Sequence, residues 1–370
     1  MAEEEHTPAD VPSPGASQIR SGIENDYYSK EVHGPFEHFS MEAFELEEGE
    51  TLRNCEIAYT TFGELNDAKD NAVLFPHMYS GTSKDMEMYV GADSAIDPNE
   101  YFVILPNQIG NGLSTSPHNT PPPIGQGDFP RVRISDDVRA QHRLVTEEFG
   151  IEAFELVLGW SMGAQQTYEW AVRYPEMVKR AAPIAGTGRN PTHSAMLVDA
   201  LIEAIEMDPN YDDGYYDDAR EVRRGLKHHA RTWALMGVSS ELWREESWRE
   251  VGFSSLEDFN HGMWDDWFLP MDPNDLLCMA WKWKHADVSR MTDGDLEEAL
   301  GRIEARTYVM PFEKDMVFTL EDATQDEAMI PDSELRPIPS PWGHFGMFGF
   351  DPTDKEFIED AIRELLDESV

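Results

Sequence analysis

The stretch that decides the fold is Leu156-Val157-Leu158-Gly159-Trp160-Ser161-Met162-Gly163-Ala164, an apolar run that ends in a Gly-x-Ser-x-Gly pentapeptide. A helical pattern follows it from Gln165 to Tyr174. Strand, sharp turn and helix in this order are typical of a nucleophile elbow, which leaves one serine hydroxyl exposed at a strained turn. The flanking glycines permit close backbone packing, and the helix N-terminus favours a developing negative charge. The pattern predicts that Ser161 is a nucleophile; the alternative is a plain tight turn.

Short apolar runs on both sides of this pentapeptide predict an α/β fold. Such runs suit parallel strands that are buried on both faces, and they occur at 72–76, 101–106, 154–158, 180–185, 306–310 and 334–338. Helical patterns occur at 135–149, 165–174 and 354–366. Alternation of this kind predicts a mostly parallel sheet that is flanked by helices.

The strand pattern is interrupted between residues 188 and 300, and this interval predicts an inserted helical cap. Seven of the ten tryptophans lie there: Trp233, Trp243, Trp248, Trp264, Trp267, Trp281 and Trp283. Aromatic side chains at helical spacing also pack in ordinary cores, which is the alternative reading. We therefore expect an acidic, flexible N-terminus at 1–38, a core at 39–187 and 301–370, and a cap (lid) at 188–300.

The net charge is extreme, −43, from 72 acidic and 29 basic residues. Self-repulsion of this size strains a compact fold in dilute buffer, whereas at molar salt the Debye length falls to about 3 Å. The composition therefore predicts a salt-rich cytoplasm, as in halophilic archaea; an ordinary acidic enzyme is the alternative. Nucleic acids and anionic membranes are poor partners for such a field.

The sequence lacks the patterns typical of metal sites, dinucleotide cofactors, secretion and membrane insertion. Cys55 and Cys278 stand among apolar neighbours without metal-ligand spacing, so we expect free buried thiols and no metal. No glycine-rich dinucleotide fingerprint follows the first strand, so we expect no cofactor. With no secretory signal and no run of 18 apolar residues, the protein is expected to be soluble and cytoplasmic.

A serine nucleophile needs a base, and the base needs a carboxylate to orient it. On a fold with a nucleophile elbow, the partners follow in the order Ser, acid, His, on loops after late strands. Asp315 follows the strand that ends at Met310, and His344 lies in a glycine-flanked loop after the last strand. Glu313 and Asp322 compete with Asp315 for this role, and Glu313 is the next candidate if Asp315 only caps a turn. His77 precedes the serine, which contradicts that order.

The tetrahedral intermediate of such a reaction needs backbone N–H donors, the oxyanion hole. One donor is expected at Met162, directly after the nucleophile. The other is expected at Tyr79, in the turn that follows an early strand, His77-Met78-Tyr79-Ser80-Gly81.

Several separate motifs resemble the homoserine O-acetyltransferase-like branch of the α/β-hydrolase superfamily. They occur in order from about Phe44 to the C-terminus, in segments 58–66, 70–74, 77–82, 106–112, 129–130, 138–141, 169–171 and 208–211. The resemblance implies a triad of Ser161, Asp315 and His344, an acyl-enzyme intermediate, and a helical cap that shapes a narrow tunnel. It also makes a homodimer through the cap a reasonable expectation.

Two positions bear on the substrate. Transferases of this family carry an aspartate directly after the catalytic histidine, where it helps to hold the amino-acid acceptor; this chain has Phe345 there. The family's substrate-binding arginine matches Arg231, although a cap arginine also pairs with structural carboxylates. The ammonium group of an amino-acid acceptor would therefore find no carboxylate at position 345, whereas an anionic group of a substrate could still pair with Arg231.

These observations favour an enzyme that hydrolyses a small acyl ester or thioester through an acyl-enzyme. One alternative is an O-acetyltransferase that uses acetyl-CoA as the donor substrate and homoserine or a related hydroxyl compound as the acceptor. A second alternative is a non-catalytic binding protein with this fold.

Overall fold

One eight-stranded sheet organises residues 22–370, the part of the chain that this computed structural model describes. The strand order is β1-β2-β4-β3-β5-β6-β7-β8. Pairs β1–β2 and β2–β4 are antiparallel and the others are parallel, so the predicted mostly parallel sheet is confirmed. The strands are β1 (Glu37–Glu45), β2 (Thr51–Phe62), β3 (Ala72–Leu74), β4 (Phe102–Pro106), β5 (Leu156–Trp160), β6 (Arg180–Ile184), β7 (Arg306–Val309) and β8 (Ser333–Leu335).

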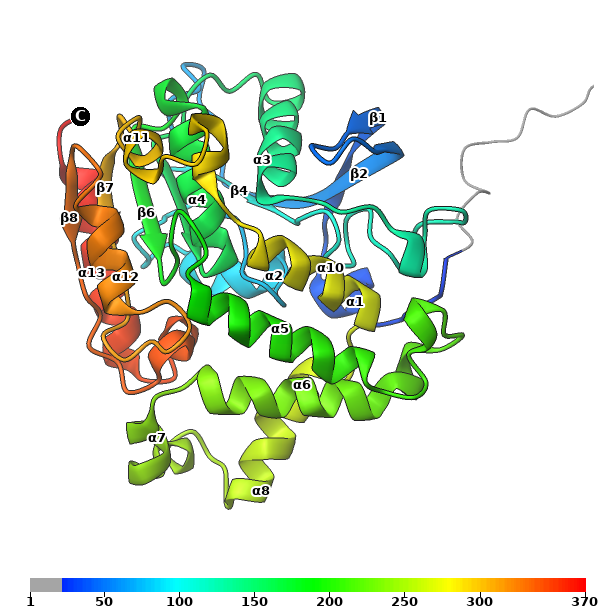
Figure 1. The fold of residues 1–370 in the computed structure, drawn as a ribbon. Helices are drawn as coiled ribbons and strands as arrows, with labels where there is room; N and C mark the ends of the chain where they lie inside the picture. Colours follow the sequence, from blue (N-terminus) through cyan, green and yellow to red (C-terminus); the bar gives the residue numbers. More distant parts are fainter. Residues whose placement is uncertain (1–21) are drawn as a thin grey trace, which may run out of the picture.

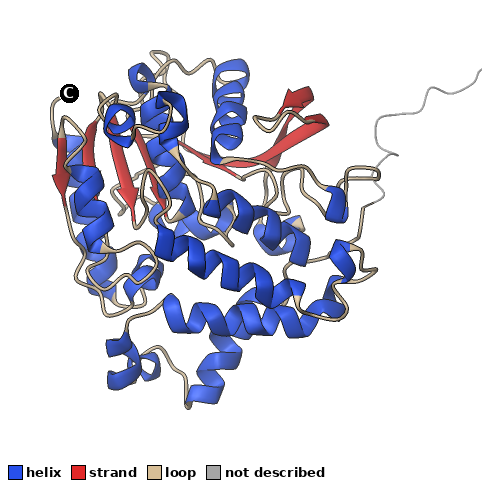
Figure 2. Ribbon diagram, viewed as in Figure 1, coloured by secondary structure: helices blue, strands red, loops and turns tan. Residues whose placement is uncertain are grey.

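Helices cover both faces of the sheet (Figure 2). Successive strand residues point to opposite faces, so in β5 Val157 packs with α3 and α4, whereas Leu156 and Leu158 pack with α2 and α13. The helices of the core are α1 (Lys30–His33), α2 (Ser83–Met86), α3 (Ile134–Arg143), α4 (Met162–Arg173), α12 (Leu320–Glu327) and α13 (Pro352–Asp367).

The interval between β6 and β7 is helical, as the sequence predicts for a cap. In Figure 1, α5 and α6 run side by side below the sheet, and α7 and α8 lie farther from it. Four of the cap tryptophans, Trp233, Trp248, Trp264 and Trp283, are buried, so they also pack as core residues. The helices are α5 (Thr192–Glu206), α6 (Arg223–Met236), α7 (Ser240–Glu245), α8 (Leu256–Phe259), α9 (Asp266–Phe268), α10 (Pro273–Lys284) and α11 (Leu296–Leu300).

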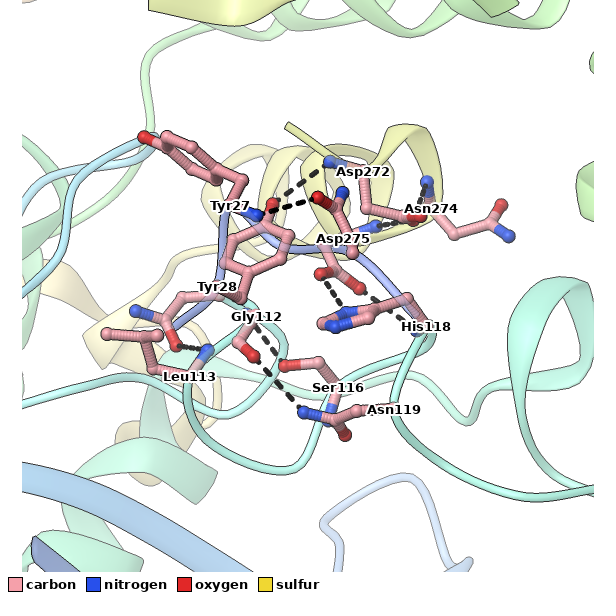
Figure 3. Close-up of polar contacts among 12 residues, drawn as sticks. Tyr27, Tyr28, Gly112, Leu113, Ser116, His118, Asn119, Asp272, Asn274 and Asp275 are labelled. Atoms are coloured by element: carbon pink, nitrogen blue, oxygen red, sulfur yellow. Dashed lines mark hydrogen bonds and ion pairs between the residues drawn. The ribbon is translucent and has the colours of Figure 1, made fainter. Parts of the chain in front are cut away.

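The N-terminal segment packs against the core earlier than the expected boundary at residue 38; residues 1–21 lie outside the described range. The Tyr28 ring stacks on His118 with the ring centroids 4.7 Å apart, and its hydroxyl accepts a hydrogen bond from the Asp272 N–H at 3.0 Å. His118 Nδ1 lies 2.5 Å from Asp275 Oδ2 (Figure 3). The packing of the Tyr28 ring thus attaches part of the N-terminal segment that was expected, from its composition, to be flexible.

Membrane crossing and the state of the two cysteines are visible in the structure of residues 22–370. No helix in this range combines the length and the apolar character that crossing a bilayer requires. Cys55 and Cys278 are free thiols; Cys55 is buried, whereas Cys278 is half-buried.

Asp326 of α12 fixes the point where the chain leaves β6 for the cap. Its Oδ2 accepts a hydrogen bond from the Gly188 N–H at 2.8 Å, and the side chain is buried. Burial raises the pKa of Asp326 from its ordinary value of 3.8 to about 7, and the neighbouring Asp322 raises it further, while the hydrogen bond from Gly188 opposes the rise. The folded protein therefore holds a proton that the unfolded chain releases at lower pH.

We predict that Asp326 contributes a fall in the free energy of unfolding as the pH rises from about 4 to about 7, because in this window its carboxyl is protonated in the folded state and ionised in the unfolded chain. One such proton changes it by at most about 1.4 kcal/mol per pH unit. Asp326→Asn keeps an oxygen acceptor for Gly188 and removes the titration. In urea unfolding at about pH 5 and about pH 7.5, the variant should lose less stability than the wild type. Equal losses in both proteins would contradict the assignment.

Candidate active site

Ser161 lies at the turn between β5 and α4, and its backbone is strained as the sequence predicts. Its φ and ψ are 60° and −118°, in a region that residues with a side chain rarely adopt. A Cβ on Gly159 would collide with the backbone of Gly163, and one on Gly163 would collide with the carbonyl of Pro76. The two glycines of the pentapeptide are therefore required by close packing around the serine.

The structure brings the three predicted triad residues together in a hydrogen-bonded row. His344 Nε2 lies 2.9 Å from Ser161 Oγ, and His344 Nδ1 lies 2.7 Å from Asp315 Oδ2. All three side chains are buried. The alternative acid, Glu313, is exposed. With Nδ1–H donating to the carboxylate, Nε2 is the ring nitrogen that accepts a proton.

Asp315 is itself held by the backbone that follows it. Its Oδ1 accepts hydrogen bonds from the N–H groups of Val317 at 2.7 Å and Phe318 at 3.1 Å. The carboxylate therefore uses one oxygen to fix its own position and the other to orient His344. Asp315 lies six residues after the end of β7, and the chain that follows it turns back to donate these two amides.

Two tryptophans also hold His344, and sequence reasoning missed both roles. Trp160 Nε1 donates to the His344 carbonyl oxygen at 3.2 Å. The Trp233 ring, on α6 of the cap, stacks on the imidazole with centroids 6.0 Å apart and an interplanar angle of 24°. Trp160 is one of the two variable residues of the pentapeptide, so its position next to Ser161 was the available signal; nothing in the sequence pointed to Trp233.

Of the two expected oxyanion donors, Met162 directly follows Ser161, and Tyr79 lines the same cavity as Ser161. Within residues 22–370, neither the Tyr79 N–H nor the Met162 N–H donates a hydrogen bond to another protein group. The Tyr79 hydroxyl donates to the Leu276 carbonyl of α10 at 3.0 Å, which attaches the turn to the cap. Both amides are therefore free to donate to a developing oxyanion, and their role as its donors stays a prediction.

His77 organises this turn. Its Nδ1 lies 2.7 Å from the Met78 carbonyl, and its Nε2 lies 3.1 Å from both the Gln108 N–H and Asn111 Nδ2. A carbonyl only accepts, so Nδ1 carries the proton and Nε2 accepts. Burial lowers the pKa of His77 to about 3, although the hydrogen bond to Met78 opposes the shift. His77 is a neutral structural residue, consistent with its place before the serine.

A small cavity of about 280 Å³ opens onto Ser161 and His344. Aromatic rings form most of its wall, and no carboxylate or cation of the described residues lines it. Phe345 is one of these rings, and Gly237 of the cap makes room for it, because a Cβ there would collide with the Phe345 ring. The lining residues are Met78, Tyr79, Ser80, Trp160, Ser161, Trp233, Trp267, His344, Phe345 and Phe348.

Arg231 does not line this cavity, so the substrate contact implied for it is not found. Its Nη1 lies 2.7 Å from Asp265 Oδ1, and the same carboxylate lies 3.3 Å from Lys227 Nζ and 2.8 Å from His261 Nδ1. The structure thus shows the alternative pairing, an ion pair within the cap. Among residues 22–370 there is also no group of three or more His, Cys, Asp or Glu side chains that could hold a metal.

The family model for the alpha/beta hydrolase fold matches residues 71–350, so the chain belongs to the α/β-hydrolase family of enzymes. An ethyl acetate hydrolase of Pseudomonas veronii is 51% identical over 343 residues, 92% of this chain and 98% of the relative. A homoserine O-acetyltransferase of Chlorobaculum parvum is 31% identical, over 82% of this chain and 88% of the relative. The crystal structure of an acetylester hydrolase from Corynebacterium glutamicum, 48% identical, matches with a TM-score of 0.92 and covers 94% of this chain and 100% of that one.

We predict that Asp315→Asn lowers the reactivity of Ser161. If the amide oxygen keeps the hydrogen bonds from Val317 and Phe318, the NH₂ group faces His344 Nδ1 and forces the proton onto Nε2. That tautomer cannot accept the serine proton, which costs a factor of about 10³ or more. The measurement is the rate at which a fluorophosphonate probe labels Ser161. Glu313→Gln is the matched control and should label at the wild-type rate; a similar loss in both variants would contradict the assignment.

Proposed function

We propose that this chain is a serine esterase that hydrolyses small acyl esters, acetyl esters above all, through an acyl-enzyme. The observation that carries the proposal is the hydrogen-bonded row of Ser161, His344 and Asp315 at the wall of a small apolar cavity. The ester hydrolases named above, similar over almost the whole chain, support it.

The geometry gives each residue a step. Ser161 Oγ attacks the ester carbonyl carbon while His344 Nε2 takes the hydroxyl proton. The carbonyl oxygen becomes an anion and accepts hydrogen bonds from the amides of Tyr79 and Met162. The C–O bond to the alcohol breaks, and His344 returns the proton to the leaving alkoxide. Water then repeats the sequence, attacking the acyl carbon while His344 accepts its proton, and Ser161 is released with a carboxylic acid.

The size and lining of the cavity support a small, uncharged substrate. The space beside Ser161 is about 280 Å³ even when the solvent at its opening is included. The walls offer dispersion contacts with aromatic rings and leave the hydrogen-bonding groups concentrated at Ser161, His344 and Ser80. An ester with a short acyl chain and a short alcohol fits these properties.

The same features disfavour transfer to homoserine. Phe345 puts an apolar ring where an ammonium group would need a carboxylate, and Arg231 is paired with Asp265. An amino-acid acceptor would therefore be desolvated in the cavity without a charged partner, which is costly. Water needs no such partner. An acetyltransferase that uses acetyl-CoA remains the alternative to be tested.

The test is hydrolysis of p-nitrophenyl acetate in concentrated salt. We expect turnover by the wild type and only the uncatalysed background with Ser161→Ala, because no other described group can take over the nucleophile's place at His344. Equal rates for the two proteins would refute the proposal. In a second arm with acetyl-CoA and homoserine, transfer to homoserine that is much faster than hydrolysis would establish the alternative instead.

We further propose that the protein works in a salt-rich cytoplasm, on the basis of its net charge of −43. Screening of this charge should raise the midpoint of thermal unfolding by more than about 5 °C between about 0.1 M and about 2 M NaCl, or about 4 kcal/mol for a chain of this size. Sucrose, an uncharged solute, is the control for general stabilisation. An equal effect of sucrose and salt would contradict the electrostatic cause. The haloarchaeal origin and a homodimer through the cap stay predictions.

A further inference from the structure

The catalytic cavity has an identifiable mouth. Most of the residues that line it are buried, and the three that are partly exposed are Ser80, Trp267 and Phe348. Solvent therefore meets the cavity at these side chains, and a substrate has to pass them to reach Ser161. Ser80 belongs to the turn that carries Tyr79, Trp267 belongs to α9 of the cap, and Phe348 follows the His344 loop.

These three side chains close the mouth by direct contact. Trp267 Nε1 donates a hydrogen bond to Ser80 Oγ at 2.8 Å. The Trp267 ring meets Phe348 edge to face, with centroids 5.3 Å apart and an interplanar angle of 75°. The indole thus spans the opening from the oxyanion turn to the histidine loop. One hydrogen bond holds the cap side of the mouth to the core side.

A second cavity, of about 260 Å³, lies on the other side of Ser80. Tyr79 and Ser80 line both cavities, so this turn is the wall between them. Tyr27 and Tyr28 of the N-terminal segment line the second cavity as well. If the Trp267–Ser80 contact is broken, the catalytic cavity gains a path into space that a longer substrate can use.

The local backbone of the cap suits a movable contact. α9 has only three residues, and the turn directly before it, Asn260–Asp265, is a wide π-helical turn. Such turns pack less closely than α-helix and occur frequently at functional sites. Trp267 is thus carried by a short irregular element, whereas Ser80 belongs to the turn that His77 fixes to the core.

We propose that Trp267 and Ser80 determine the size specificity of this enzyme, their hydrogen bond closing the mouth of the catalytic cavity and limiting the substrate to short esters. This inference rests on the proposed esterase function. It assigns the two residues no chemical step; they act on which ester reaches Ser161.

The test compares kcat/KM for p-nitrophenyl hexanoate with kcat/KM for p-nitrophenyl acetate. Trp267→Phe removes the donor and keeps a ring, and Ser80→Ala removes the acceptor. Each is expected to raise the hexanoate-to-acetate ratio about tenfold, which corresponds to about 1.4 kcal/mol, the size of one net hydrogen bond. Because both variants break the same bond, the double variant should shift the ratio no further than either single variant.

Trp283→Phe is the matched control. Its indole N–H also makes a hydrogen bond, in this case within the cap, by donating to Asn190 Oδ1 at 3.1 Å, but Trp283 does not line the cavity. Its ratio should stay at the wild-type value. An unchanged ratio in folded Ser80→Ala, an additive shift in the double variant, or an equal shift in Trp283→Phe would overturn the proposal. Circular dichroism establishes folding, and Ser80→Ala alone decides the matter if Trp267→Phe does not fold.

The experiment distinguishes failure of the proposed size specificity from failure of the proposed esterase function. Wild-type hydrolysis of the acetate ester that depends on Ser161, with unchanged ratios in the variants, refutes only the role of Trp267 and Ser80. If the wild type and Ser161→Ala hydrolyse the acetate ester equally slowly or equally fast, both proposals are refuted.

Discussion

The hydrogen bond between His344 Nε2 and Ser161 Oγ is the interaction on which the rest of the site depends. It joins residues 183 positions apart in the chain, and each comes from a different loop at the same end of the sheet. The strained turn after β5 presents the serine, the loop after β7 brings Asp315, and the loop after β8 brings His344. A mostly parallel sheet makes this meeting possible, because the carboxyl ends of parallel strands lie at one edge. Trp160 of β5 and Trp233 of the cap then restrict the histidine, the first by a hydrogen bond and the second by stacking.

A chain with 72 acidic residues has to keep carboxylates away from a site where negative charge develops. Aromatic rings line most of the cavity. The only carboxylate of the triad, Asp315, pairs with the ring nitrogen of His344 that faces away from Ser161. There the negative charge stabilises the imidazolium that forms when Ser161 loses its proton. Arg231 and Lys227, two cationic side chains of the cap, both form ion pairs with Asp265. The acidity is thus a property of the surface, separate from the chemistry.

Sequence reasoning located the chemistry because the elbow imposes local requirements. Glycines at 159 and 163 are needed for packing, and their spacing around Ser161 marks a strand that turns into a helix. The order of serine, acid and histidine then selected Asp315 and His344. The contacts that depend on distant segments were out of reach: the Trp233 stack on His344, the pairing of Arg231 with Asp265, and the Trp267–Ser80 hydrogen bond. The packing of Tyr28 against His118 was missed for the same reason, because a short aromatic segment shows its partner only in three dimensions.

The central claim is that Ser161 carries the acyl group between two half-reactions. The most direct measurement is mass spectrometry of the protein, quenched in acid during turnover of an acetyl ester and then digested. The account predicts one acetyl group on the peptide that contains Ser161, its loss to water on longer incubation, and no label in Ser161→Ala. Turnover without acetylation of that peptide, or an acetyl group carried by another residue, would contradict it.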